Sequence, residues 1–194
     1  YTFTFCFYMN YFELYNIPVA LTVNANAVKK KYYELSRQFH PDFYSNATEQ
    51  EREEALEKSS LVNKAFKTFN NNDELIKYVL QLKGLLQEEE KYNLPNDFLM
   101  EMLELNEALT DAKMDDDNEK IATIKSQISN FKSVIYEPVK AIIENYKEGI
   151  TTKEELLQVK AYYFKEKIFE PYFGRNRMMV HICNPIQMPG WRNW

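Results

Sequence analysis

Glycine and cysteine are both scarce in this sequence, and each shortage excludes something. Its 194 residues include only 4 glycines and 2 cysteines. Cys6 and Cys183 lie near opposite ends with no Cys-x-x-Cys pair, which excludes a disulfide framework and a zinc site of ordinary spacing. Two free thiols in a reducing compartment are the simpler interpretation. The few glycines and the scarcity of alternating β-branched runs predict an all-α protein.

Long apolar runs and an excess of positive charge are also missing. No run approaches the roughly 18 to 20 apolar residues of a membrane-spanning helix, so we expect no membrane partner. The formal net charge is -5, and the one basic cluster is small, so we expect no nucleic-acid partner. Hydrophobic residues make up 45% of the chain, which is enough for a core in each of two small domains.

The two ends of the sequence lack the helical periodicity of the rest. Residues 1–8 are apolar but too short for a signal sequence, and the amphipathic pattern begins only after Met9. We therefore expect Met9 to be the natural start. Because no basic, serine-rich leader is present, we also expect a cytoplasmic location. Residues 171–194 gather proline, glycine, methionine and both tryptophans, and form a disordered tail, a frame-shifted end or a small docking segment.

The tripeptide His40, Pro41 and Asp42 directly follows a segment with the pattern of an amphipathic helix. The apolar stripe of that segment is Val28, Tyr32, Leu35 and Phe39, and the opposite face carries Lys29, Lys30, Tyr33 and Arg37. Proline disfavours helical geometry at the residue before it, so the helix must end at about His40. An imidazole and a carboxylate are thereby held at a bend beside a basic surface.

Local sequence leaves several interpretations of this bend open. A catalytic site would need a third positioned group, and the only other histidine, His181, lies in the C-terminal tail. Hydrogen bonds within the turn would also account for His40 and Asp42, because aspartate and proline are common turn residues. The basic face is either a solvated helix surface or a docking surface for an acidic protein partner.

Further helical patterns follow along the chain. We predict helices over residues 11–16, 24–39, 48–69, 73–84, 96–113, 116–146 and 151–168. Pro138 should kink the sixth of these helices. We expect Asn96 or Asp97 to cap the fifth helix, and Thr151 or Thr152 to cap the seventh. The predicted apolar line of the seventh helix is Leu157, Ala161, Phe164 and Ile168.

A charged segment divides these helices into two groups. Residues 85–95 are weakly periodic and end in Pro95, which predicts a linker between a domain at residues 9–84 and a second domain at residues 96–170. Short connections between the last three helices favour antiparallel neighbours, hence a three-helix bundle.

The first helix of this bundle carries an unusual outward face. Its core stripe is Phe98, Met102, Leu105 and Leu109, and the opposite side places Glu104, Glu107 and Asp111 within about 40 degrees of Met100. Leu99 and Leu103 flank that face. Large apolar side chains beside carboxylates suit a protein-binding surface with a charged rim. Alternatively, Leu99 and Leu103 pack under the linker or the first domain.

The order helix, basic helix, HPD and helix resembles a J domain, the module by which co-chaperones engage DnaK-type ATPase chaperones. The span from about residue 11 to residue 168 resembles the HscB family, called Jac-type in mitochondria, which serves iron–sulfur cluster biogenesis. The matching segments are YFELYNIP, RQFHPDFY, SSLVNKAFKTF, VLQLKG and FLMEMLELNEAL. The resemblance implies an L-shaped protein in which a J domain precedes a scaffold-binding three-helix bundle.

What the resemblance implies about function is an adaptor that is not itself an enzyme and needs no cofactor or metal. Its J domain would stimulate an HscA/DnaK-type chaperone, and its bundle would deliver an IscU-type scaffold. The chaperone-binding residues would be His40, Pro41, Asp42, Lys29, Lys30, Tyr33 and Arg37. The scaffold-binding residues, from the resemblance together with the helical geometry, would be Leu99, Met100, Leu103, Glu104, Glu107, Asp111, Tyr163 and Phe164.

The sequence departs from the family pattern in two places. Phe43 and Tyr44 follow HPD, where members usually carry a basic residue, and the paired Cys-x-x-Cys motifs of animal members are absent. Two alternative functions remain: a general J-protein that feeds unfolded clients to a DnaK-type chaperone, and a small hydrolase that uses His40 and Asp42. The scaffold adaptor and the general J-protein differ by client, because only the scaffold adaptor requires a folded scaffold protein.

Overall fold

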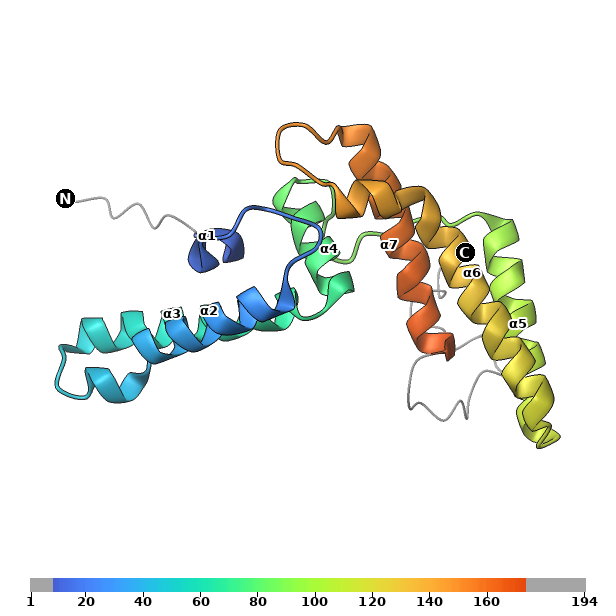
Figure 1. The fold of residues 1–194 in the computed structure, drawn as a ribbon, viewed down its shortest axis with the longest axis horizontal. Helices are drawn as coiled ribbons and strands as arrows, with labels where there is room; N and C mark the ends of the chain where they lie inside the picture. Colours follow the sequence, from blue (N-terminus) through green and yellow to red (C-terminus); the bar gives the residue numbers. More distant parts are fainter. Residues whose placement is uncertain (1–8, 174–194) are drawn as a thin grey trace. The chain divides into compact units, whose positions relative to one another are not determined.

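The computed structural model describes residues 9–173, with side chains as far as Phe169, and this part of the chain is all helical (Figure 1). Its elements are α1 (Tyr11–Tyr15), α2 (Ala25–Gln38), a 3₁₀ turn η1 (Pro41–Tyr44), α3 (Glu49–Phe69), α4 (Asn72–Leu82), α5 (Asn96–Met114), α6 (Asn118–Glu144) and α7 (Lys153–Phe173). The predicted all-α class is confirmed. No helix within residues 9–173 is long and apolar enough to cross a membrane. The tail was predicted to begin at residue 171, but residues 171–173 belong to α7. The cysteines, His181 and residues 174–194 lie outside the described residues.

Polar side chains mark several helix starts at the predicted positions. Asn10 and Glu13 form a capping box at α1, and Thr48 and Glu51 form another at α3. Asn24 caps α2 by accepting hydrogen bonds from two backbone N–H groups. The side chain of Glu51 accepts from both the backbone and the hydroxyl of Thr48, and these bonds lower the pKa of Glu51.

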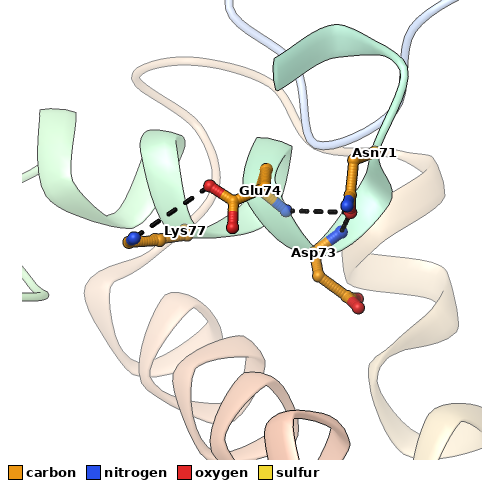
Figure 2. A network of polar contacts seen from close by, with 4 residues as sticks. All are labelled: Asn71, Asp73, Glu74 and Lys77. Carbon is orange, nitrogen blue, oxygen red and sulfur yellow. Dashed lines mark hydrogen bonds and ion pairs between the residues drawn. The ribbon is translucent and has the colours of Figure 1, made fainter. Parts of the chain in front are cut away.

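Helix α4 shows how local sequence sets a boundary (Figure 2). The side-chain oxygen of Asn71 accepts from the backbone N–H of Asp73 at 2.9 Å and of Glu74 at 3.2 Å. The two carboxylates lie in the first turn, where the helix dipole favours negative charge, and Glu74 also pairs with Lys77 at 4.0 Å. Gly84 follows the helix at φ +66°, a left-handed conformation that suits glycine.

Helices α2 and α3 form an antiparallel hairpin closed by η1, with α1 packed against both (Figure 1). The buried residues of this hairpin and α1 are Phe12, Tyr15, Val28, Leu35, Ala55, Val62, Ala65 and Phe69. Of the apolar stripe predicted for α2, Tyr32 and Phe39 are only half-buried, and Tyr32 stacks on Phe66 of α3 at 4.1 Å between ring centroids. The rings of Phe12 and Tyr15 both pack against Phe69. The apolar face predicted for α2 therefore packs against α3.

The chain packs as two compact units. The first contains the described residues up to Lys91 together with Tyr136–Tyr163, and the second contains Tyr92–Ile135 together with the described residues from Phe164 to Phe173. Helices α6 and α7 therefore each contribute to both units. These packed units differ from the two domains predicted on either side of the charged linker. The predicted domain boundaries at residues 84 and 96 stay a prediction.

Two ion pairs join distant segments within the first unit. Lys83, just after α4, pairs with Glu148 in the connection between α6 and α7. Lys160 of α7 pairs with Glu90 of the linker at 2.5 Å, and this bond lowers the pKa of the Glu90 carboxyl. The parts of α6 and α7 in this unit bury Val139, Ile143, Leu156, Val159 and Tyr163.

The core of the second unit is built from three helices. Its buried residues are Phe98, Met102, Leu109 and Ala112 of α5, Ile124 and Ile128 of α6, and Phe169 of α7. Ile121, Phe131 and Ile135 of α6 pack against the same cluster, at helical spacing from Ile124 and Ile128. Asn106 is also buried, at 6% exposed, and its side-chain oxygen has no hydrogen-bond partner among the described residues.

Two sequence predictions about these helices are wrong. The N-cap of α5 is Pro95, which makes no side-chain cap, because Asn96 already lies inside the helix. The apolar line of α7 is shifted by one residue in its first half: Leu157 is 44% exposed, whereas Leu156 is 5% exposed. Two adjacent leucines offer two registers, and a shift of one residue turns a helix face by about 100 degrees.

Candidate functional site

The HPD bend lies where α2 ends and η1 begins. The backbone N–H of Phe39 donates to the carbonyl of Leu35 at 2.9 Å and completes the last turn of α2. His40 then takes an extended conformation with ψ 128°, as expected for a residue before proline. Pro41 occupies the first position of η1, where its missing N–H is harmless. The helix end predicted from the proline is therefore confirmed.

The side chains of His40 and Asp42 form a small local network on the surface. The Nδ1 atom of His40 accepts from the backbone N–H of Asp42 at 3.3 Å, and the Asp42 Oδ2 atom lies 3.5 Å from the same nitrogen. The two side chains are 52% and 86% exposed, so both can reach a partner.

The basic face of α2 lies on the exposed side of the hairpin, as predicted. Lys29, Lys30, Tyr33 and Arg37 are all exposed, and Tyr33 is 60% exposed despite its aromatic ring. Lys31 differs from these residues, because it is half-buried and pairs with Glu34 at 3.1 Å. The exposed cations and the HPD bend are consecutive in the chain and belong to one packed unit.

Nothing in the described residues completes a catalytic or metal site at this bend. No group of three histidine, cysteine, aspartate or glutamate side chains within residues 9–173 is arranged to hold a metal ion. The histidine and aspartate at the bend bond the turn and face solvent. The arrangement suits polar contacts with another macromolecule.

The outward face of α5 keeps its predicted character. Met100 is 56% exposed and Leu103 is 40% exposed, and the carboxylates of Glu104, Glu107 and Asp111 are exposed on the same side of the helix. Leu103 therefore does not pack beneath another segment, which was the alternative prediction. Apolar and acidic side chains together form the surface that we call the α5 face.

Leu99 is the one predicted member of the α5 face that turns partly inward. It is half-buried and packs against the core cluster of the second unit. Leu99 therefore lies at the edge of the α5 face. The position lies between the core stripe and the outward side, as its spacing from Phe98 and Met100 requires.

Two predicted aromatic residues of α7 have different surroundings. Tyr163 is 7% exposed, and burial together with the nearby charges of Glu74 and Asp73 raises the pKa of its phenol. Its ring is therefore interior and not available at the surface. Phe164 is half-buried and stacks on Tyr92 of the linker, with ring centroids 4.5 Å apart and planes 4° from parallel. Sequence reasoning missed this stack, and the only signal for it is the aromatic residue within the charged linker.

A helical hairpin that presents HPD on an exposed bend, followed by a further set of packed helices, defines the class of J-domain co-chaperones. Residues 94–165 match the family description "HSCB C-terminal oligomerisation domain". The co-chaperone protein HscB homolog of Shewanella amazonensis is 34% identical over 137 residues, which cover 70% of this chain and 79% of that protein. The chain belongs to the HscB family of co-chaperones.

Other relatives agree with this assignment. The co-chaperone protein HscB of Buchnera aphidicola from Acyrthosiphon pisum is 34% identical over 154 residues, covering 77% of this chain and 88% of that protein. The crystal structure of human co-chaperone protein HscB matches with a TM-score of 0.62 at 26% identity, covering 86% of this chain and 83% of the human chain. Chaperone HscB from Vibrio cholerae shares the fold, with a TM-score of 0.59 at 22% identity over 84% of this chain and 99% of that chain.

Family membership confirms several predictions. The chain is a J-protein co-chaperone of the family that serves iron–sulfur cluster assembly, and it is not an enzyme. The hydrolase alternative is therefore set aside. The family implies chaperone and scaffold partners in general. The roles of the individual residues above stay predictions.

Proposed function

We propose that this protein stimulates the ATPase of an HscA/DnaK-type chaperone and delivers an IscU-type iron–sulfur scaffold to it. The observation that carries the proposal is the presence of two exposed surfaces of opposite chemistry on two different packed units. The HPD bend with its basic face belongs to the first unit, and the acidic and apolar α5 face belongs to the second. An adaptor needs two such separate surfaces.

Charge complementarity would govern the chaperone contact. Lys29, Lys30 and Arg37 would steer α2 onto an acidic surface of the chaperone, which mainly raises the association rate and the specificity. His40 and Asp42 would then make polar contacts that differ between conformations of the chaperone. A ligand shifts a conformational equilibrium only through such a difference in affinity, and this difference is how an adaptor without an active site accelerates ATP hydrolysis elsewhere.

The scaffold contact would use apolar anchors inside a charged rim. Met100 and Leu103 supply exposed apolar surface on α5, and Glu104, Glu107 and Asp111 surround it with carboxylates. Interface energy usually concentrates in a few desolvated anchors, while the rim sets orientation. Leu99 and Phe164 are retained as half-exposed members of this proposed contact. Tyr163 is withdrawn from it, because its ring is buried.

The chaperone half is tested by His40→Gln in a steady-state ATPase assay with a purified HscA-type chaperone. Stimulation should disappear, because glutamine cannot reproduce the local network with Asp42, while binding to IscU should stay unchanged. Lys125→Gln, which replaces an exposed residue of α6 in the other unit, is the matched control and should stimulate normally. Undiminished stimulation by His40→Gln would refute the assignment.

The scaffold half is tested by calorimetric titration of folded IscU with Met100→Ala and Glu104→Ala. We expect Met100→Ala to weaken binding by about tenfold, a loss of about 1.4 kcal/mol, since truncating an interface anchor costs at least this much. Val134→Ala removes a similarly exposed apolar side chain from α6 and should bind normally. If folded IscU does not bind the wild type but unfolded polypeptides do, the general J-protein alternative holds instead.

We also propose a cytoplasmic location. The partner in this proposal hydrolyses ATP, so the complex needs a compartment that supplies ATP. Fractionation of cells that express the natural gene, followed by immunoblotting, tests this location, and recovery of the protein outside the cytoplasmic fraction would contradict it.

A further inference from the structure

Phe43 presents its ring to solvent directly beside the HPD bend. It is 71% exposed, which makes it the most exposed phenylalanine or tyrosine in the described residues. A ring in this position adds almost nothing to the core of the hairpin. Isolated exposed apolar residues are common on protein surfaces, but this one lies next to the residues that the proposed function places against a partner.

The position of this ring is defined by local structure. The backbone N–H of Phe43 donates to the carbonyl of His40 at 3.1 Å, which closes the 3₁₀ turn. The rings of Phe43 and His40 meet edge to face, with centroids 6.1 Å apart, a favourable geometry for an aromatic pair. Tyr44 does not share this exposure, because it is half-buried and donates its hydroxyl to the carbonyl of Gln38 at 3.2 Å. One ring of the turn is therefore tied down and the other projects.

We propose that Phe43 is an apolar anchor that inserts into an apolar recess of the ATPase chaperone, beside the acidic surface that receives the basic face of α2. This inference rests on the proposed function and adds the chemistry of a second contact. Phe43 adjoins Asp42 and touches His40, so a surface that engages those two residues also covers the phenylalanine ring. The occupant is therefore the same chaperone that binds the HPD bend.

An apolar contact at this point complements the charges around it. The lysines and arginine of α2 provide attraction that weakens as salt rises, whereas burial of a ring is nearly independent of salt. The covered ring also excludes water from the polar contacts of His40 and Asp42, and such contacts strengthen when they are desolvated. Phe43 thus sets affinity, while the histidine and aspartate set the response of the chaperone.

The test uses the full chain and measures chaperone ATPase rate against co-chaperone concentration at several ionic strengths. Phe43→Ala should raise the half-maximal concentration by about tenfold, the usual scale for truncation of an interface anchor, and leave the maximal rate unchanged. The half-maximal concentration of Phe43→Ala should depend on ionic strength as that of the wild type does, whereas the half-maximal concentration of Arg37→Ala should depend on it less. Phe43→Leu should recover most of the affinity. Leu56→Ala, which truncates a 63% exposed side chain of α3, is the matched control and should behave as the wild type.

Other outcomes overturn the inference. An unchanged half-maximal concentration for Phe43→Ala would show that the ring stays outside the interface. A lowered maximal rate would instead make Phe43 a positioning residue for His40. If Phe43→Ala and the wild type differ in sedimentation coefficient when no chaperone is present, the ring contacts a second copy of the chain instead. If the wild type stimulates and His40→Gln does not, the proposed function stands whatever Phe43→Ala shows. A wild type that gives no stimulation refutes the proposed function itself.

Discussion

The hydroxyl of Tyr15 is buried in the helical hairpin and donates to the carbonyl of Val62 at 2.9 Å. Burial raises the pKa of this phenol, and the nearby Tyr32 adds to the shift. Above the ordinary tyrosine pKa of 10.0, the unfolded chain loses this proton while the folded chain keeps it. The unfolded state then binds fewer protons, so stability falls as the pH rises.

We therefore expect Tyr15→Phe to change stability in a manner that depends on pH. Near neutral pH the variant should lose about 1 kcal/mol, because the Val62 carbonyl loses its buried donor. Between pH 9 and pH 11, a range chosen to bracket the ordinary pKa, its free energy of unfolding should fall less than that of the wild type. Chemical denaturation at a series of pH values measures both effects. A residual slope is expected in the variant, because burial also raises the pKa values of Tyr146 and Tyr163. Identical slopes in variant and wild type would contradict the prediction.

Asn106 is a second polar residue closed off from solvent. Its side-chain oxygen is buried without a hydrogen-bond partner in the part of the chain that the structure describes, and an unsatisfied buried polar group is destabilising. We expect Asn106→Leu, which has similar volume, to raise the free energy of unfolding by about 1 kcal/mol. Guanidinium denaturation measures the change, with the exposed Asn93→Leu as a control that should shift stability by less than about 0.5 kcal/mol. Loss of stability in Asn106→Leu would mean that the amide is needed in place.

Single residues also show what sequence reasoning can and cannot predict. The exposure of His40, Asp42, Met100 and Glu104 follows from proline geometry and helical spacing, which are local properties. Tyr163 illustrates the opposite case. It precedes Phe164 directly, yet its ring is buried near the charges of Glu74 and Asp73 of α4, a segment far away in the sequence that no local pattern reports.

At the scale of elements, the register of α7 is the clearest difference between prediction and structure. Leu156 is 5% exposed and Leu157 is 44% exposed, although the two residues are chemically identical. Leu156→Ala should destabilise the protein by about 2 to 5 kcal/mol, because it leaves a cavity in the core. Leu157→Ala is its matched control and should cost less than about 1 kcal/mol. Thermal and chemical denaturation measure the stability of both variants. A larger loss of stability in Leu157→Ala than in Leu156→Ala would support the predicted register instead.

The other elements show why most of the fold was predictable. Helices α2 and α6 carry apolar residues at strict helical intervals, and such long periodic segments specify both their type and their buried face. The start of α5 is less predictable, because Pro95, Asn96 and Asp97 all have properties found at helix starts. Periodicity locates a helix well, but it locates the ends poorly.

At the scale of the whole molecule, the two predicted surfaces emerge on two packed units, but the composition of those units does not follow from the sequence. A charged segment at residues 85–95 is a local signal for a linker. The packing of Tyr136–Tyr163 with the N-terminal half of the chain depends on contacts between residues far apart in the sequence. No periodicity or composition reports such contacts, and the ion pair of Lys160 with Glu90 is one of them.

This ion pair should protect the linker. Lys160 is only 12% exposed, and its bond to Glu90 holds the linker against α7. Lys160→Met should therefore speed the cleavage of the linker by a glutamate-specific protease severalfold, because local opening becomes easier. Gel electrophoresis of a digestion time course measures the rate. Lys125→Met changes an exposed lysine of α6 and should leave the rate unchanged. Equal rates for Lys160→Met and the wild type would show that the pair does not protect the linker.

The sharing of α6 and α7 between the two packed units has a consequence for anyone who divides the gene. A fragment that ends in the linker would lack Tyr136–Tyr163, and with them the partners of Lys83 and Glu90. The first unit would then lose the buried side chains of Val139, Ile143 and Val159, and the apolar surface that covers them would be exposed to solvent. Isolated halves of this chain would be poor substitutes for the intact protein in solubility and in interaction screens.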